Sequence, residues 1–471
     1  MEAFAGFAEH TDEQIGRLVA SLQEMGTLDN TLFIYILGDN GASAEGGPEG
    51  AYNEIMALNG IISTPEINMP HLSNWGDPTT FPHYAIGWAW AGDTPFQWTK
   101  QIASHYGRTT NGVVIHWPAR VKAKGEIRSQ FTYVTDIAPT VLEAAGLPFP
   151  KSVNGTTQRP FDGTSMLYTF DKPKAKETHS TQYFEMFANR GIYKDGWIAC
   201  TRHSIPWVLG APLPELSKDI WELYNVAQDF SEANDLAAKN PAKRKELQAV
   251  FMQEAVKNHV LPIDDRRAER FNPALAGRAD LMGDRTSLTV YPGMTGMMEN
   301  AFINVKNRSY TVTAPVELKD SNTNGVIIAQ AGAFGGWVIY MKEGKVHHEY
   351  NFFGVERTNV ASPNVLPSGK HEIKYEFVAD SPKLGTGGKC VLYVDGQQVA
   401  EGRIPKTQPF IFSGDVGVDN ETMVSNDYNP GENKFTGKII SVTIDTKPSN
   451  LSAADEKAVE DGEYMAATME D

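Results

Sequence analysis

The feature that most constrains the fold is a change in residue periodicity near residue 286. From about Ser287 to Ile444, short segments of alternating apolar and polar residues follow one another, such as "GVIIAQAG", "WVIYMKEGKVHHEYNF" and "CVLYVDGQQVA". Gly, Asn and Asp stand in the turns between them. A period of two is typical of half-buried strands, and many short strands joined by such turns are typical of sandwiches. The sequence therefore predicts a β-sandwich of the jelly-roll type over residues 286–448.

Residues 1–285 have a different pattern, in which strands alternate with helices. An amphipathic helix over residues 1–26 precedes the apolar strand Leu32–Leu37, and a second strand, "NGVVIHWP", precedes a helix that begins near Asp136. Alternating strands and helices are typical of a parallel sheet flanked by helices. We therefore expect an α/β domain over residues 1–285.

The later part of this α/β region contains a hairpin and a helix. From about Thr181 the sequence alternates on both sides of Asp195-Gly196, which predicts two antiparallel strands around a tight turn. The segment "NPAKRKELQAVFMQEAVKNH" predicts a charged amphipathic helix. The acidic residues 449–471, beyond the sandwich, are expected to form a short helix or a loose tail.

Composition excludes several classes of function. The net charge of −16, from 42 basic and 58 acidic residues, disfavours binding to nucleic acid or to anionic membranes. The two cysteines, Cys200 and Cys390, are far apart and form no CxxC motif, so a zinc cluster or a disulfide scaffold is not expected. We find no apolar run of the ~18–20 residues that a membrane span needs. The N-terminus has the pattern of an amphipathic helix rather than a signal peptide, so we expect the chain as given to be cytoplasmic.

The end of the first strand carries the first candidate site residues. In "TLFIYILGDNGASAEGG", Asp39 and Asn40 stand between Gly38 and Gly41 directly after the strand. A carboxylate and an amide on a glycine-flanked strand end suit a hard cation or an oxyanion. An ordinary Asp-Asn-Gly turn after a strand explains the same residues. The pattern alone leaves both interpretations open.

Four ordered segments resemble the arylsulfatases of the alkaline phosphatase-like superfamily. They are "LFIYILGDNGASAEGG", "TPFQWTKQIASHYGRTTNGVVIHWP", "DIAPTVLEAAGLP" and "WELYNVAQDFSEANDLA". The resemblance implies a divalent cation, usually calcium, with Asp39 and Asn40 among its ligands. It also implies that Lys100 contacts the sulfate of a small ester substrate. His105 is either a general acid near the leaving group or a hydrogen-bonded loop residue.

The sequence also departs from that family. A sulfatase nucleophile is a cysteine or serine in Cys-x-Pro-x-Arg, oxidised to formylglycine, and a paired Asp-Asp before it supplies further cation ligands. The Cys-x-Pro-x-Arg motif is absent, and the pair Asp264-Asp265 lies near the end of the α/β region rather than early in the chain. Cys200 and Cys390 lack the flanking proline and arginine, so formylglycine cannot form from them. Both are expected to be core cysteines. We therefore expect the C-terminal portion of an arylsulfatase, whose intact relatives are often periplasmic.

Such a truncation would have consequences for association and for activity. Central strands would gain an exposed edge, so we expect self-association, a homo-oligomer, or partial cover by loops of residues 51–110. One hypothesis is residual metal-assisted hydrolysis of activated phosphate or sulfate esters. An alternative is a non-catalytic pseudo-sulfatase whose sandwich binds a carbohydrate or is structural. A third is that a separate chain supplies the missing segment.

Other polar residues have structural explanations that compete with a functional one. His10 and Asp12 lie two apart on the first helix and so do not share a face. His83 lies in a Trp-rich loop that either covers an aromatic substrate or, as we expect, contributes hydrophobic packing through Trp88 and Trp90. Arg202 follows a strand and either holds an anionic substrate or forms a surface ion pair, and His203 stands next to it. The adjacent His347 and His348 point to opposite faces of a strand and are excluded as joint ligands.

Overall fold

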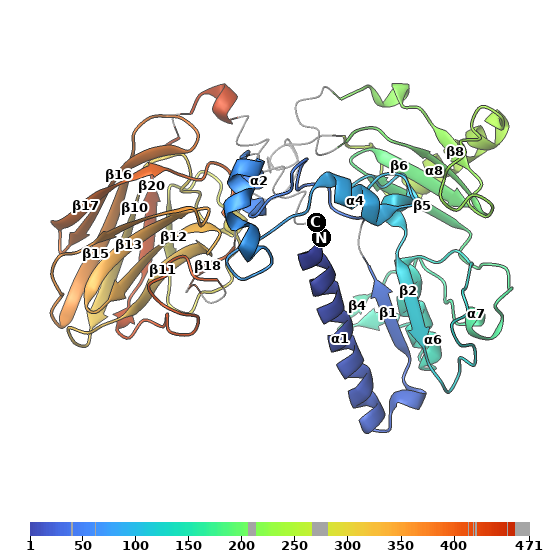
Figure 1. The fold of residues 1–471 in the computed structure, drawn as a ribbon, viewed down its shortest axis with the longest axis horizontal. Helices are drawn as coiled ribbons and strands as arrows, with labels where there is room; N and C mark the ends of the chain where they lie inside the picture. The colour runs from blue at the N-terminus through green and yellow to red at the C-terminus, as the bar shows by residue number, and fades with distance from the viewer. Residues whose placement is uncertain are drawn as a thin grey trace. The chain divides into compact units, whose positions relative to one another are not determined.

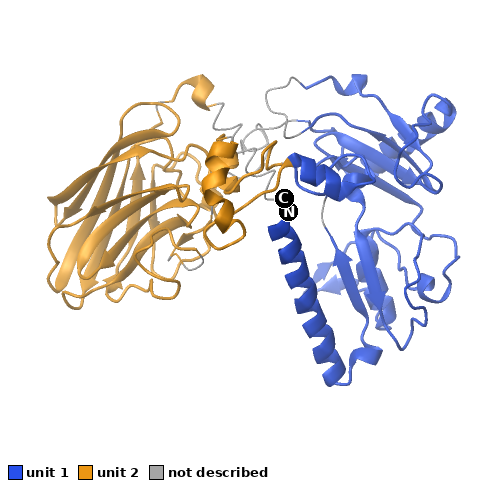
Figure 2. Ribbon diagram, in the orientation of Figure 1, with its two compact units in different colours: residues 1–44, 86–265 blue, residues 45–85, 266–471 orange. Residues whose placement is uncertain are grey.

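The computed structural model describes residues 1–38, 41–61, 63–205, 213–265, 281–412, 414–417, 419, 422–449 and 451–456. It divides into two compact units, which Figure 2 colours separately. Unit 1 consists of residues 1–44 and 86–265, and unit 2 of residues 45–85 and 266–471. The described helices include none that combines the length and the apolar character needed to cross a bilayer.

Unit 1 contains helices, short strands and one larger sheet (Figure 1). Its helices are α1 (Glu2–Glu24), α4 (Ile86–Asp93), α5 (Tyr106–Thr109), α6 (Ile137–Ala144), α7 (Tyr168–Asp171) and α8 (Pro241–Lys257). Its strands are β1 (Phe33–Leu37), β2 (Gly112–His116), β3 (Ser152–Val153), β4 (Thr156–Thr157), β5 (Thr181–Met186), β6 (Asn189–Lys194), β7 (Trp197–Thr201) and β8 (Glu222–Tyr224). The predicted first helix, the two predicted strands and the helix after Asp136 are confirmed.

The predicted parallel sheet is wrong for these strands. β1 pairs with β2 in antiparallel register, with Phe33 opposite His116 and Leu37 opposite Gly112. The segment between the two strands is long and irregular, so it does not dictate their relative direction, as a short βαβ crossover would. The two strands form a sheet of their own in the described structure.

The four-stranded sheet β5-β6-β7-β8 is the core of unit 1. Asp195 and Gly196 both have positive φ, 47° and 79°, as a type I′ turn between β6 and β7 requires, so the predicted hairpin is confirmed. The predicted amphipathic helix is α8, and Leu247, Phe251 and Ala255 form its buried face at a spacing of four residues. They pack on the sheet in one hydrophobic cluster.

Unit 2 is built on the predicted β-sandwich, whose two sheets face each other in Figure 1. One sheet has the order β17-β16-β15-β10-β20-β9, with β19 paired to β10, and the other has the order β14-β13-β12-β11-β18. The strands are β9 (Ser287–Val290), β10 (Tyr310–Leu318), β11 (Gly325–Gly332), β12 (Gly335–Lys342), β13 (Lys345–Phe352), β14 (Glu356–Ala361), β15 (Gly369–Ala379), β16 (Thr386–Val394), β17 (Gln397–Lys406), β18 (Val416–Gly417), β19 (Lys438–Ile439) and β20 (Val442–Thr446).

The alternation along these strands places their side chains as predicted. His348 is fully buried in β13 and stacks on Tyr375 with ring centroids 3.7 Å apart. Its neighbour His347 stacks on Tyr340 instead. The two imidazoles therefore lie on opposite faces of the strand, which confirms that they cannot chelate one ion together.

Residues 45–85 differ from the predicted division, because they group with the sandwich rather than with the α/β unit. This segment contains α2 (Glu54–Leu58) and α3 (Pro65–Asn68). The Asn53 amide donates a hydrogen bond of 2.9 Å to the carbonyl of Phe353, and the Asn59 side chain accepts one of 3.0 Å from the Phe410 amide. The apolar face of α2 packs around Phe353. These contacts join residues 300 or more positions apart, so no local sequence pattern predicts them.

Candidate active site

The segment after β1 lies against the loop that carries Lys100. Asp39 and Asn40 themselves lie outside the described residues, but Gly41 and Ala42 follow them directly. Gly41 has φ 85°, and a Cβ built on it would lie 2.5 Å from the Lys100 backbone nitrogen, so only glycine fits there. The Lys100 amide donates a hydrogen bond of 3.2 Å to the Ala42 carbonyl. The chain next to the predicted cation ligands is therefore fixed beside the predicted sulfate-binding residue.

The Lys100 loop itself has an unusual backbone. Trp98 and Gln101 have φ of 67° and 76°, a region that costs non-glycine residues of order 1 kcal/mol each. The backbone at Gly107 packs closely against residues 97 and 98. A Cβ on Gly107 would lie 2.2 Å from the carbonyl oxygens of Gln97 and Trp98, so only glycine fits there. Strain that the surrounding structure maintains in this way is concentrated at functional sites.

His105, the second predicted catalytic residue, is completely buried. Its Nδ1 lies 2.8 Å from the Ser104 hydroxyl and its Nε2 lies 3.1 Å from Oε2 of Glu222. The Cys200 Sγ lies 3.7 Å from the same Nε2. A general acid must reach a substrate oxygen. The burial therefore favours the alternative in which His105 is a hydrogen-bonded residue within the loop.

Two carboxylates that the sequence did not single out surround this imidazole. Burial pushes the pKa of Glu222 up, but hydrogen bonds from His105 and Tyr224 outweigh it and hold that pKa below its usual value. The Tyr224 hydroxyl donates to Oε2 of Glu222 at 2.5 Å. Burial raises the pKa of Glu232 to about 7, and its Oε2 accepts a hydrogen bond of 2.9 Å from the Tyr106 amide. Glu222 therefore carries negative charge at neutral pH, while Glu232 titrates there.

The two cysteines are buried and unbridged, as predicted. Burial, and then the charges of Glu232 and Glu222, raise the pKa of Cys200 well above its usual value. Burial likewise raises the pKa of Cys390, to about 11. A buried thiol with a raised pKa is a poor nucleophile.

Aromatic side chains and one arginine lie on the outer side of the same loop. The guanidinium of Arg202 lies over the Trp98 ring, 4.5 Å from its centroid, and the Trp90 ring meets Trp98 edge-on at 6.3 Å. Trp88 and Trp90 remain about half exposed, so the predicted hydrophobic packing does not account for them. An exposed guanidinium held by an aromatic ring retains its charge for an anionic group.

The structure does not bring the other candidates into this cluster. His10 and Asp12 are exposed on α1. His83 belongs to unit 2, where its Nε2 lies 3.9 Å from Glu45. His203 is buried and its Nδ1 lies 2.9 Å from Asp219, which explains it as a structural residue.

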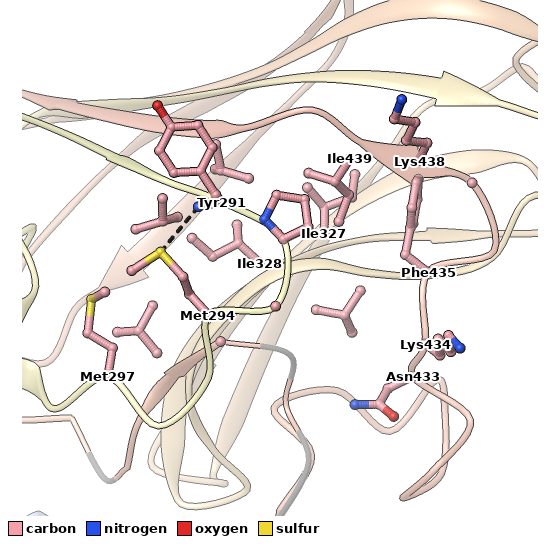
Figure 3. A pocket seen from close by; sticks show the side chains of 18 of the residues that line it. Tyr291, Met294, Met297, Ile327, Ile328, Asn433, Lys434, Phe435, Lys438 and Ile439 are labelled. Carbon is pink, nitrogen blue, oxygen red and sulfur yellow. Dashed lines mark hydrogen bonds between the residues drawn. The ribbon is translucent and has the colours of Figure 1, made fainter.

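One cavity lies in unit 2 and does not resemble a catalytic site. It has a volume of about 580 Å³ and is lined by residues of both sheets (Figure 3). Figure 3 shows Met294, Met297 and Phe435 around it, and the charged residues in its lining are Lys434 and Lys438. Most of the lining is apolar, and the described residues of the lining include no histidine, cysteine or carboxylate.

Two family models match consecutive parts of the chain. The model described as Sulfatase matches residues 1–147, and the model described as N-sulphoglucosamine sulphohydrolase, C-terminal, matches residues 107–259. The matched residues include β1, the Lys100 loop and the sheet β5–β8 with α8.

Two curated sulfatases are similar to part of this chain. An uncharacterized sulfatase of Schizosaccharomyces pombe is 30% identical over 58% of this chain and 47% of its own length. An arylsulfatase of Klebsiella aerogenes is 30% identical over 35% of this chain and 34% of its own length. The solved structure of Ps i-CgsB with k-i-k-neocarrahexaose covers 58% of this chain and 47% of its own, with 20% identity and a TM-score of 0.37.

The matched segments together span residues 1–259, and over these residues the chain is similar to the sulfatase family. The chain spans less than half the length of these two curated relatives.

Proposed function

We propose that this chain supplies the cation-binding and sulfate-binding half of an active site for sulfate-ester hydrolysis. The observation that supports the proposal most strongly is the close contact between Gly41-Ala42 and Lys100. This contact keeps the chain that follows Asp39 and Asn40 next to the lysine backbone. Lys100 would then neutralise the negative charge that builds on the sulfate oxygens in the transition state.

Asp39 and Asn40 are the proposed ligands of a divalent cation, with calcium as its most suitable identity. Carboxylate and amide oxygens are the donors that calcium prefers. A bound divalent cation would supply Lewis-acid polarisation of the ester and of a nearby water. Two ligands are too few for calcium, which takes six to eight oxygens, so other groups must complete the site.

The nucleophile is proposed to come from a Cys-x-Pro-x-Arg segment that is not within residues 1–471. Cys200 and Cys390 are buried core residues outside such a motif, which supports a source elsewhere. Without that segment, the chain is proposed to retain only slow metal-assisted hydrolysis of activated phosphate or sulfate esters, acting on small substrates.

Turnover of 4-nitrophenyl phosphate and 4-nitrophenyl sulfate by the full chain, with divalent cations or with chelator, tests this residual activity. We expect Asp39→Ala and Lys100→Ala to lower kcat/KM by about 100-fold, the usual effect of removing one transition-state contact. Lys194→Ala, which removes a half-buried lysine from another part of unit 1, is the matched control. Hydrolysis that survives Asp39→Ala, or that ignores chelator, would refute the proposal.

Complementation tests the larger claim. Co-expression with the N-terminal segment of a sulfatase that carries Cys-x-Pro-x-Arg should produce sulfate-ester turnover that depends on Lys100. If the two chains co-purify and 4-nitrophenyl sulfate is still not cleaved, then this chain does not supply half of such a site.

Carbohydrate binding by the sandwich is a second candidate function. On the face of the five-stranded sheet that carries His347, Asn359 donates a hydrogen bond of 2.9 Å to Glu349, and Arg357 lies 3.6 Å from the same carboxylate. Aromatic and planar polar side chains on one face are the groups that hold sugars in many proteins. Glycan binding that His347→Ala weakens, in a chain without any turnover, would favour this candidate over hydrolysis.

A further inference from the structure

We propose that His105, Cys200 and Glu222 form a buried binding site for one transition-metal ion, with Zn²⁺ as its preferred occupant. The site is separate from the calcium ligands proposed at Asp39 and Asn40, and it does not depend on sulfate-ester hydrolysis. It uses a nitrogen, a sulfur and an oxygen donor, which is a set typical of zinc and unsuited to calcium.

The three donor atoms converge on one point. Sγ of Cys200 lies 3.7 Å from Nε2 of His105, and Oε2 of Glu222 lies 3.1 Å from the same nitrogen. All three atoms lie within 4.8 Å of one another. Tetrahedral zinc with Zn–S near 2.3 Å and Zn–N near 2.0 Å places sulfur and nitrogen about 3.5 Å apart. The observed separations therefore need only small side-chain adjustments to accept the ion.

The backbone holds two of the donors rigidly. Cys200 in β7 and Glu222 in β8 are direct cross-strand partners, so their side chains leave the same face of the sheet. His105 reaches that face from the Lys100 loop, just before α5. Donors fixed on adjacent strands are better positioned than donors on mobile loops.

The neighbouring hydroxyls have the arrangement that a bound imidazole needs. Ser104 Oγ lies 2.8 Å from Nδ1 of His105, so a proton on Nδ1 can be donated to it, which leaves the Nε2 lone pair for a metal. The Tyr224 hydroxyl donates to Glu222 and fixes the carboxylate. A water molecule can occupy the fourth position. The Glu222 side chain is 29% exposed, which gives an ion a path from solvent.

Two other interpretations of the cluster fit less well. A Cys-His nucleophile pair would need an accessible thiol, and Cys200 has no exposed surface. In a purely hydrogen-bonded cluster, Nε2 would donate to Glu222 and Cys200 would be an ordinary core residue. Metal binding differs from this in one measurable step, because the thiol proton leaves for solvent as the sulfur–metal bond forms.

Titration of the full chain with Co²⁺, a spectroscopic substitute for Zn²⁺, tests the proposal. Protein without a histidine tag should bind one Co²⁺ and show a thiolate-to-cobalt charge-transfer band that Zn²⁺ then removes. Cys200→Ser should abolish the band, whereas Cys390→Ser, which changes the other buried cysteine, should keep it. Ser104→Ala should keep the band and weaken Co²⁺ binding by about 10- to 100-fold, as loss of a partner behind a ligand does.

The wild-type chain gives a result that does not depend on whether the variants fold. Stoichiometric Zn²⁺ should raise its Tm, and each Zn²⁺ bound should release protons. The absence of a charge-transfer band in folded wild-type protein would overturn the proposal. A band that Cys390→Ser abolishes and Cys200→Ser retains would overturn it as well.

Discussion

Two regions of unit 1 differ in how many of their apolar side chains are buried. The covered region, formed by β5–β8 and α8, contains fully buried side chains in every layer, including Ile192, Leu223 and Phe251. The open region, formed by α1, β1 and β2, contains none: α1 has no buried residue, and Phe7 on it is 72% exposed (Figure 1). Both regions lie within the segments that match sulfatase family models.

The difference shows that an amphipathic pattern predicts a helix but does not predict which residues bury its apolar face. The apolar residues of α1 recur at helical spacing and predict a helix that packs on something. Among the described residues, none buries that face. The open region therefore presents apolar surface on α1, β1 and β2 in the described structure.

Phe251→Ala in the covered region should give the largest effect. Removing a ring that is 1% exposed leaves a cavity beneath α8, and we expect a loss of about 3–5 kcal/mol in the free energy of unfolding. The matched variant Phe7→Ala in the open region should change it by no more than about 0.5 kcal/mol. Urea denaturation of both variants measures the contrast. Equal effects would mean that the two regions do not differ in burial as described.

The pH dependence of stability should reveal the buried Glu232 in the covered region. Burial raises its pKa from 4.5 to about 7, so the folded protein holds this proton more tightly than the unfolded chain does. The contribution to stability is therefore greatest below about pH 4.5 and is lost as the pH rises to about 7, by about 3 kcal/mol in total.

Comparison of wild type with Glu232→Gln isolates this effect from other titrating groups. Glutamine keeps an oxygen for the Tyr106 amide but has no proton to lose, so the difference between the two stability curves should appear between about pH 4.5 and 7. Urea melts with chelator present provide the curves. Parallel curves for the two proteins across this range would show that Glu232 is ionised in the folded state throughout.

Exposed strands make association the next expected effect. Val114 in β2 is 53% exposed, and we expect the chain to self-associate through this edge. Val114→Lys should weaken the association by about tenfold, since an edge lysine opposes pairing with another strand. Sedimentation across a concentration series measures the dissociation constant. Ile127→Lys, at a loop residue that is 91% exposed, is the control that should leave it unchanged.

The sequence predicted those elements whose signal is local. The alternation after Ser287 predicted the strands of the sandwich, and the Asp195-Gly196 turn predicted the hairpin of β6 and β7. Both patterns involve residues that are close in the sequence. The direction of β2 relative to β1, and the placement of residues 45–85 on the sandwich, depend on contacts between distant residues and could not be read locally.

The same distinction holds for the candidate site. A family resemblance identified Lys100 and His105, and the contact of Gly41 with the Lys100 backbone is consistent with one shared site. Glu222 lies beside His105 only because β7 and β8 pair in a particular register. Glu232 stands in the segment "QDFSEAND", among other polar residues, and is buried. Polar residues that folding brings inside leave no periodic signal in the sequence.

The smallest expected effect on stability comes from a surface ion pair of the covered region, and it can be compared with the effect of the buried Phe251. On the outer face of α8, the Lys243 ammonium lies 3.1 Å from Glu246, a pair three residues apart and partly exposed. Exposed helix pairs of this kind contribute about 0.3–0.5 kcal/mol, because water and salt screen them. Glu246→Gln should therefore cost no more than this in a urea melt, roughly a tenth of the Phe251→Ala effect. A loss of several kcal/mol would mean that surface charge, rather than the buried face of the helix, holds α8 on the sheet.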